Sequence, residues 1–95
     1  MLACSFLIEQ GLQIVARNLV VPGGEVDIVA RDRATALVVE VRTLTRSHHP
    51  LDAIDVSKRA HVRRLAQALG IVRLDLIGVG LHDHHYIIHW DQNTF

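Results

Sequence analysis

Apolar residues recur along the chain with two different periods, and the change of period marks the expected elements. Leu2, Ala3, Phe6 and Leu7 follow the spacing of a helical stripe, and Gly11 is a typical helix stop. The sequence therefore predicts a first helix that ends before Gly11.

Three strands are predicted next. Residues 12–20 are rich in apolar and β-branched side chains, and a Pro-Gly-Gly turn follows at 22–24. Residues 25–31 alternate between two sets of side chains, as the two faces of a strand require. Residues 36–43 are almost continuously apolar, which predicts a strand covered on both faces.

The second half predicts a helix between strands. After a polar loop at 44–50, a helix is expected from about Asp55 or Ser57 to Leu69, where Gly70 ends it. Its buried stripe follows the spacing i, i+3, i+4, i+7 and consists of Val62, Leu65, Ala66 and Leu69. Residues 71–79 and 86–90 are expected to form two further strands.

This order, α-β-β-β-α-β-β, predicts an α/β fold. A strand–helix–strand step favours a right-handed crossover between parallel strands, so the sheet is expected to be mixed, with helices packed against it. A chain of 95 residues is expected to form one domain, residues 1–95.

Composition narrows the classes of protein that fit. The single cysteine, Cys4, cannot form an internal disulfide, and no apolar run is long enough for a membrane span, so a cytoplasmic protein without membrane contact is expected. Ten basic and ten acidic residues balance, so net charge does not indicate nucleic acid. Aromatic residues make up 4%, too few for a base-stacking platform.

Two carboxylates are expected to meet on a hairpin. If residues 32–35 form a four-residue loop, Asp27 lies opposite Glu40 and Glu25 lies opposite Arg42, all on one face. Opposed like charges are unfavourable and need a cation. A divalent metal is one answer, since Mg²⁺ binds one or two carboxylates with waters and phosphate. An ion pair from Arg42 to Glu25 or Glu40, without chemistry, is the other.

Those residues also carry a family resemblance. Residues 24–30 (GEVDIVA) and 39–43 (VEVRT) resemble the core of the YraN-like uncharacterised protein family. Most of the chain takes part, because the similarity continues at Gly11, 16–18 (ARN), 50–55 (PLDAID), Lys58 and 73–79 (RLDLIGV).

The resemblance implies a restriction-endonuclease-like fold related to nucleases with the PD-(D/E)xK motif, Holliday-junction resolvases among them. It implies Asp27 and Glu40 as ligands of Mg²⁺ or Mn²⁺ and places Arg42 where the motif has its catalytic lysine. Glu25 is a candidate for tuning the metal from outside its ligand shell. A nuclease-like protein that acts on DNA is the function implied.

Two departures from the family pattern predict weak or lost activity. Arg42 replaces the lysine, and an arginine stays charged and cannot act as a base. Family members usually carry a Gly-Glu pair in the first helix. By spacing, that glutamate falls at or before Met1, so the ligand is expected to be absent here, and either the chain starts late or the site is reduced.

The expected second helix carries basic residues suited to DNA phosphates: Lys58, Arg59, Arg63 and Arg64. A solvated helix face is the alternative for these side chains.

Seven histidines suggest a different site. The tract 82–85 (HDHH) and His89 contain ligand types for zinc, although a surface loop is the simpler interpretation. His48 and His49 are expected in a polar loop that could reach the carboxylates. Besides the nuclease, a non-catalytic module that binds DNA or a protein, and a histidine-based zinc protein, stay open. The oligomeric state, a homodimer included, also stays open.

Overall fold

The computed structural model describes residues 1–44 and 56–94. The order of elements is α1, β1, β2, β3, α2, β4, β5, as the sequence predicts. The bounds are α1 Leu2–Glu9, β1 Gln13–Val21, β2 Gly24–Asp32, β3 Thr35–Thr43, α2 Val56–Ala68, β4 Arg73–His82 and β5 His85–Asp91. Residues 45–55, which include His48, His49 and the PLDAID segment, lie outside the described residues.

The strands form one five-stranded mixed sheet in the order β1-β2-β3-β4-β5. Only the β3–β4 pair within it is parallel, and α2 lies between these two strands in the chain. This arrangement confirms the expected strand–helix–strand crossover and the mixed sheet. No helix in the described part of the chain is both long and apolar enough to span a membrane.

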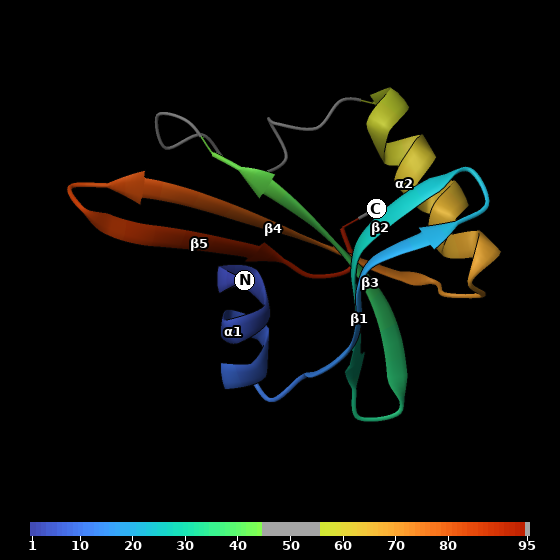
Figure 1. Cartoon of the computed structure of the whole chain (residues 1–95), viewed down its shortest axis with the longest axis horizontal. Coiled ribbons are helices and arrows are strands. Elements are labelled where there is room, and N and C mark those ends of the chain that lie inside the picture. Colours follow the sequence, from blue (N-terminus) through green and yellow to red (C-terminus); the bar gives the residue numbers. More distant parts are fainter. Residues whose placement is uncertain (45–55, 95) are drawn as a thin grey trace.

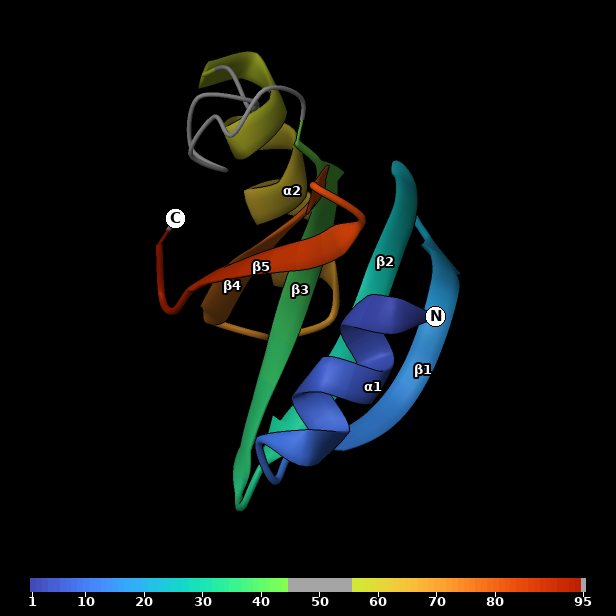
Figure 2. The same ribbon diagram turned by 90° about the vertical axis from the view of Figure 1, so that its left-hand side faces the viewer.

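The two helices cover opposite faces of the sheet (Figures 1 and 2). Leu7 of α1 packs with Ile28 and Leu37 on one face, and the buried Cys4 belongs to the same cluster. On the other face the expected stripe of α2 packs against β2, β3 and β4, with Leu69 only partly buried. Val38 of β3 and Val26 and Val29 of β2 belong to the cluster under α2, whereas Leu37 and Val39 of β3 belong to the cluster under α1.

The β2–β3 hairpin has the predicted register but a shorter loop. Ile28 pairs with Val39 and Arg31 with Ala36, as predicted. The ladder ends at the Ile28–Val39 pair, so the predicted pairs Asp27–Glu40 and Glu25–Arg42 are not part of it. Asp32 and Thr35 also pair, so the predicted four-residue loop is wrong and the turn has only two residues between the strands. Arg33 there adopts a φ of 58°, and the sequence offered no glycine or asparagine to indicate this left-handed turn. The register is the predicted one because each strand extends by one residue into the predicted loop, Asp32 on one side and Thr35 on the other.

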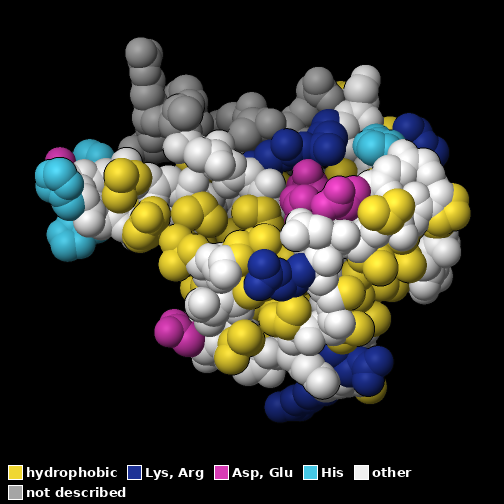
Figure 3. Space-filling view, viewed as in Figure 1, with side chains coloured by type: hydrophobic (Ala, Val, Ile, Leu, Met, Phe, Trp, Pro, Cys, Tyr) yellow, Lys and Arg dark blue, Asp and Glu magenta, His cyan; other side chains and the backbone are white. Residues whose placement is uncertain are grey.

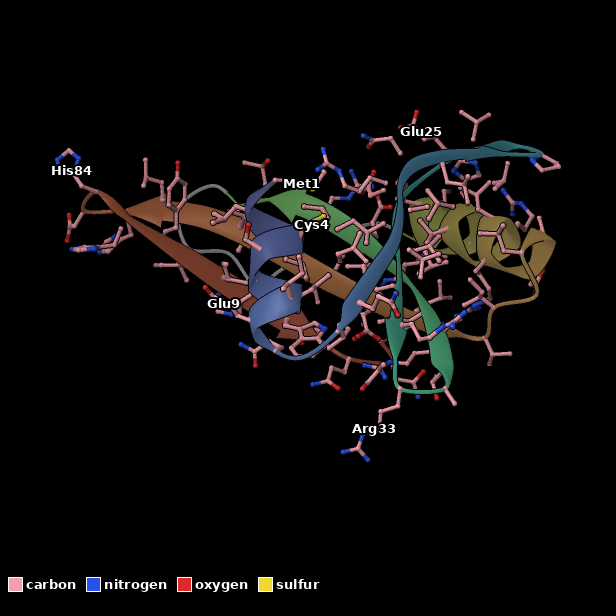
Figure 4. The ribbon with its side chains drawn as sticks, turned by 60° about the horizontal axis from the view of Figure 1, so that its bottom comes forward. Met1, Cys4, Glu9, Glu25, Arg33 and His84 are labelled. Carbon is pink, nitrogen blue, oxygen red and sulfur yellow. The ribbon has the colours of Figure 1, made fainter. Side chains whose placement is uncertain are left out.

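The β4–β5 hairpin is longer than predicted. β4 continues to His82, which pairs with His85, and the turn consists of Asp83 and His84 with positive φ. The expected strand limits at 79 and 86–90 were therefore too short. Figure 4 shows His84 at the far tip of this hairpin, where the histidine tract is exposed.

A buried aspartate holds strands together by hydrogen bonds at the end of the sheet near the C-terminus. Asp75 is 1% exposed on β4, and Arg73 binds both of its carboxylate oxygens at 3.0–3.1 Å. Trp90 Nε1 donates to Asp75 at 2.9 Å, and the backbone N–H of Asn93 donates at 2.8 Å. The network ties β4, β5 and the segment after β5 together.

Candidate functional site

Asp27 and Glu40 lie together on the face of the sheet that α2 covers. They follow directly after the Ile28–Val39 pair, Glu40 lies 3.6 Å from Lys58 of α2, and a side-chain hydrogen bond joins Asp27 to Glu40. The backbone N–H of Val41 donates to Asp27 Oδ2 at 2.8 Å, so the aspartate reaches across to β3. The structure thus brings the two predicted carboxylates to one place.

The Glu40 carboxyl group is strongly desolvated. Glu40 is 5% exposed, and burial is the largest cause that raises its pKa above the ordinary 4.5. The charge of Asp27 and a side-chain hydrogen bond to Asp27 raise the pKa further, whereas the charges of Lys58 and Arg42 lower it. A carboxylate that is buried beside a second carboxylate is stabilised either by taking up a proton or by a cation bound next to it.

Two cations meet at one oxygen of this carboxylate. Arg42 Nη2 lies 2.9 Å from Glu40 Oε1, and Lys58 Nζ lies 3.6 Å from the same atom. Of the two acidic partners considered for Arg42, the structure selects Glu40. Glu25 is exposed and makes no ion pair with the described residues, and Figure 4 places it at the periphery of the molecule.

The position of Lys58 was not recognised from the sequence. The basic residues of α2 were expected to form one phosphate-binding set, but Lys58 points toward Glu40. A signal was present, because Lys58 precedes Val62 by four residues and Leu65 by seven, which puts it on the buried stripe. Arg63 and Arg64 are exposed, and Arg59 is half-buried.

The resulting surface brings opposite charges side by side. Figure 3 shows acidic side chains over β2 next to basic side chains in the direction of α2. A phosphate approaching this face would meet the cationic groups of Arg42 and Lys58 beside the carboxylates.

The donor set fits a hard divalent cation. Asp27 and Glu40 provide carboxylate oxygens, and Mg²⁺ commonly uses one or two carboxylates and completes its shell with waters and phosphate. Within residues 1–44 and 56–94, no three His, Cys, Asp or Glu side chains gather as metal ligands. The histidine tract therefore brings no such trio together, and His82 Nε2 instead lies 3.3 Å from Asp83.

The raised pKa of Glu40 predicts how the free energy of unfolding depends on pH. Because its folded-state pKa is raised, its stabilising effect is complete below pH 4.5 and is lost as pH rises through the folded pKa. Glu40→Gln removes this titration. The free energy of unfolding of Glu40→Gln, relative to wild type, should therefore rise with pH across that window.

Urea unfolding of both proteins at a series of pH values measures this difference, in which the carboxylates that do not interact with Glu40 cancel. Glu25→Gln, a change at an exposed site on the neighbouring strand β2, is the matched control and should show no such rise. A flat difference for Glu40→Gln would contradict the raised pKa.

A known protein family accounts for most of the chain. The family described as "Uncharacterised protein family UPF0102" matches residues 1–79, which include both carboxylates, Arg42 and Lys58. The chain belongs to the UPF0102 family. This is the YraN-like family that the sequence resembled.

Individual UPF0102 proteins agree with this assignment. A UPF0102 protein of Paenarthrobacter aurescens is 45% identical over 69 residues, covering 70% of this chain and 57% of the relative. One from Chlorobium chlorochromatii is 37% identical over 93 residues, covering 88% and 72%. One from Sorangium cellulosum is 46% identical over 65 residues, covering 66% and 45%. The chain therefore spans from about half to three quarters of the length of these relatives.

Proposed function

We propose that this UPF0102 protein is a nuclease-like domain that binds DNA and hydrolyses phosphodiester bonds weakly with Mg²⁺ or Mn²⁺. The observation that carries the proposal is the buried Glu40 beside Asp27, on the face where Arg42 and Lys58 supply positive charge. The resemblance to restriction-endonuclease-like nucleases supports the same reaction. Family membership alone names no activity, so the site has to carry the argument.

Each residue has a definable task in this reaction. Asp27 and Glu40 would hold the metal ion, which supplies a Lewis acid and an activated water when bound. Arg42 binds a phosphate oxygen and stabilises the negative charge that grows there during hydrolysis. It transfers no proton, because the guanidinium stays charged. Val41 keeps Asp27 oriented through its backbone N–H.

A non-catalytic DNA- or protein-binding module is the second candidate, and one observation favours it. The 2.9 Å pair between Arg42 and Glu40 already provides the carboxylate with a positive partner. In that case the pair is a clamp between alternate positions of β3, and no metal is needed.

Titration with Mn²⁺ separates the two functions. A nuclease site binds Mn²⁺ and loses binding in Asp27→Asn, whereas a clamp binds none in either protein. Incubation with linear and branched DNA in the presence of Mg²⁺ or Mn²⁺ then tests hydrolysis. Absence of metal binding under every condition would favour the module.

DNA binding is expected to be independent of sequence and strongly dependent on salt. Phosphate contacts release counterions, so the slope of log K against log salt counts them. Changing Arg59, Arg63 and Arg64 together to Ala should reduce that slope by as much as about 3, because each arginine that neutralises a phosphate contributes roughly one.

Fluorescence anisotropy of a labelled duplex at several salt concentrations measures the slope. Arg33→Ala, which removes an exposed cation in the β2–β3 turn, serves as the control and should leave the slope nearly unchanged. A triple variant with the wild-type slope would place DNA on another surface.

A further inference from the structure

Arg42 and Lys58 balance the charge of the site from two different elements. Arg42 comes from β3 and Lys58 from α2, and both contact Glu40 Oε1. Because Glu40 is buried, its charge is costly without such partners. The oxygen that they contact belongs to the donor set proposed for the metal, so a metal ion and these cations compete for it.

We infer that Arg42 and Lys58 act as counter-cations of Glu40 in the metal-free protein. When a DNA phosphate binds these two side chains instead, Glu40 becomes available to bind a divalent ion. Metal and DNA then bind with positive coupling, each strengthening the other. The inference rests on the proposed function, because it describes how the same site is loaded.

The Arg42 contact is suited to such an exchange. It reaches Glu40 through Nη2, and its buried Nε has no hydrogen-bond acceptor among the described residues. A guanidinium has five N–H donors in a fork that matches phosphate oxygens. Moving from Glu40 to a phosphate allows more of these donors to be used, which offsets the loss of the carboxylate contact.

The Lys58 contact can also be redirected. Its 3.6 Å separation from Glu40 is longer than the roughly 2.7–2.9 Å of a strong charge-assisted hydrogen bond. The ammonium sits on a flexible stem, and 38% of the side chain is exposed. A phosphate at the surface can therefore attract it with little rearrangement of α2.

Electrostatics then sets the sign of the coupling. Without DNA, two positive groups beside Glu40 repel a divalent ion and occupy its ligand. A bound phosphate neutralises both groups, so Mn²⁺ should bind more tightly to the DNA complex. Linkage requires that Mn²⁺ strengthen DNA binding by the same factor.

The experiment measures Mn²⁺ binding by electron paramagnetic resonance of the free ion, at fixed ionic strength. The protein is titrated alone and when saturated with a short DNA duplex, and Mn²⁺ bound by the duplex itself is subtracted. For wild type we expect at least about tenfold tighter Mn²⁺ binding with DNA, within the roughly 5–150-fold range of linked sites. Gel analysis confirms that the duplex stays intact during the titration.

Two double variants with the same change of charge provide the comparison. Arg42→Gln/Lys58→Gln should bind Mn²⁺ more tightly than wild type without DNA, and its coupling factor should approach one. Arg63→Gln/Arg64→Gln, altered at exposed positions of α2, should weaken DNA binding but keep the coupling. If the first variant does not fold, Lys58→Gln alone, which keeps the shorter Arg42 contact, should show a reduced coupling factor.

The outcomes separate this inference from the function on which it rests. If Mn²⁺ binds wild type equally tightly with and without DNA, the counter-cation role is overturned and the proposed metal site stands. If coupling persists without Arg42 and Lys58, other residues cause it and the inference is also overturned. If Mn²⁺ binds under no condition, the proposed function fails together with the inference.

Discussion

Asp75→Ala should lower the free energy of unfolding by about 3–5 kcal/mol, the usual cost of removing one partner of a buried charge pair. Asp75 is buried and accepts hydrogen bonds from Arg73, Trp90 Nε1 and the backbone N–H of Asn93. The alanine leaves these donors without their acceptor in a site largely closed to water. Urea unfolding followed by circular dichroism measures the decrease.

Asp32→Ala is the matched control, because Asp32 bonds the same guanidinium. Its contact with Arg73 Nη1 is 3.1 Å, but its side chain is 41% exposed. An exposed pair contributes at most about 1 kcal/mol, so this variant should remain close to wild type in stability. Similar decreases in the free energy of unfolding for the two variants would show that the burial of Asp75 does not make its contacts more stabilising than those of Asp32.

Trp90 provides a second measurement in the same experiment. It is the only tryptophan of the chain, it donates to Asp75, and its ring meets Phe6 edge-on at a centroid distance of 5.7 Å. Its fluorescence in the folded state should therefore change in Asp75→Ala and remain as in wild type in Asp32→Ala. The fluorescence reports on local contacts and is independent of the unfolding midpoint.

The sequence predicted the order of elements and the register of the carboxylate hairpin for a simple reason. Strand residues alternate with a period of two, and Ile28 and Val39 are both buried on the face that α1 covers, so a slip by one residue would put them on opposite faces. Asp27 and Glu40 lie directly beyond the Ile28–Val39 pair, so their closeness follows from that register and does not depend on the length of the turn. For this reason the error in the loop at 32–35 did not affect the site.

Features that depend on long-range contacts were not predictable in the same way. Lys58 stands in a run of charged residues, where charge alone suggests solvent, and its direction depends on how α2 docks on the sheet. Asp75 looks like one polar residue in an apolar strand, because its partners Trp90 and Asn93 follow 15 and 18 residues later. Local pattern does not indicate that β5 will return beside β4 with these donors.

Asp27→Asn should reduce any Mg²⁺-dependent DNA cleavage by at least about 100-fold. Changes outside the ligand shell of a metal typically cost about 10–100-fold, and a direct ligand is expected at or above the upper end. Fold and stability should change little, because the asparagine side-chain oxygen can still accept from the Val41 N–H. Initial rates on linear and branched DNA, with Mg²⁺ and with Mn²⁺, measure the reduction.

Arg42→Lys should have the opposite effect and raise cleavage several-fold above wild type. A lysine ammonium is more compact than the guanidinium and releases its charge more readily in a desolvated site, so it opposes a divalent ion less. Removal of the 2.9 Å contact with Glu40 should lower the free energy of unfolding by about 1 kcal/mol. Arg33→Lys, a change in the exposed β2–β3 turn, should alter neither quantity. If Arg42→Lys stays inert and neither it nor wild type binds Mn²⁺, the Arg42–Glu40 pair is a structural clamp and this chain does not hydrolyse DNA.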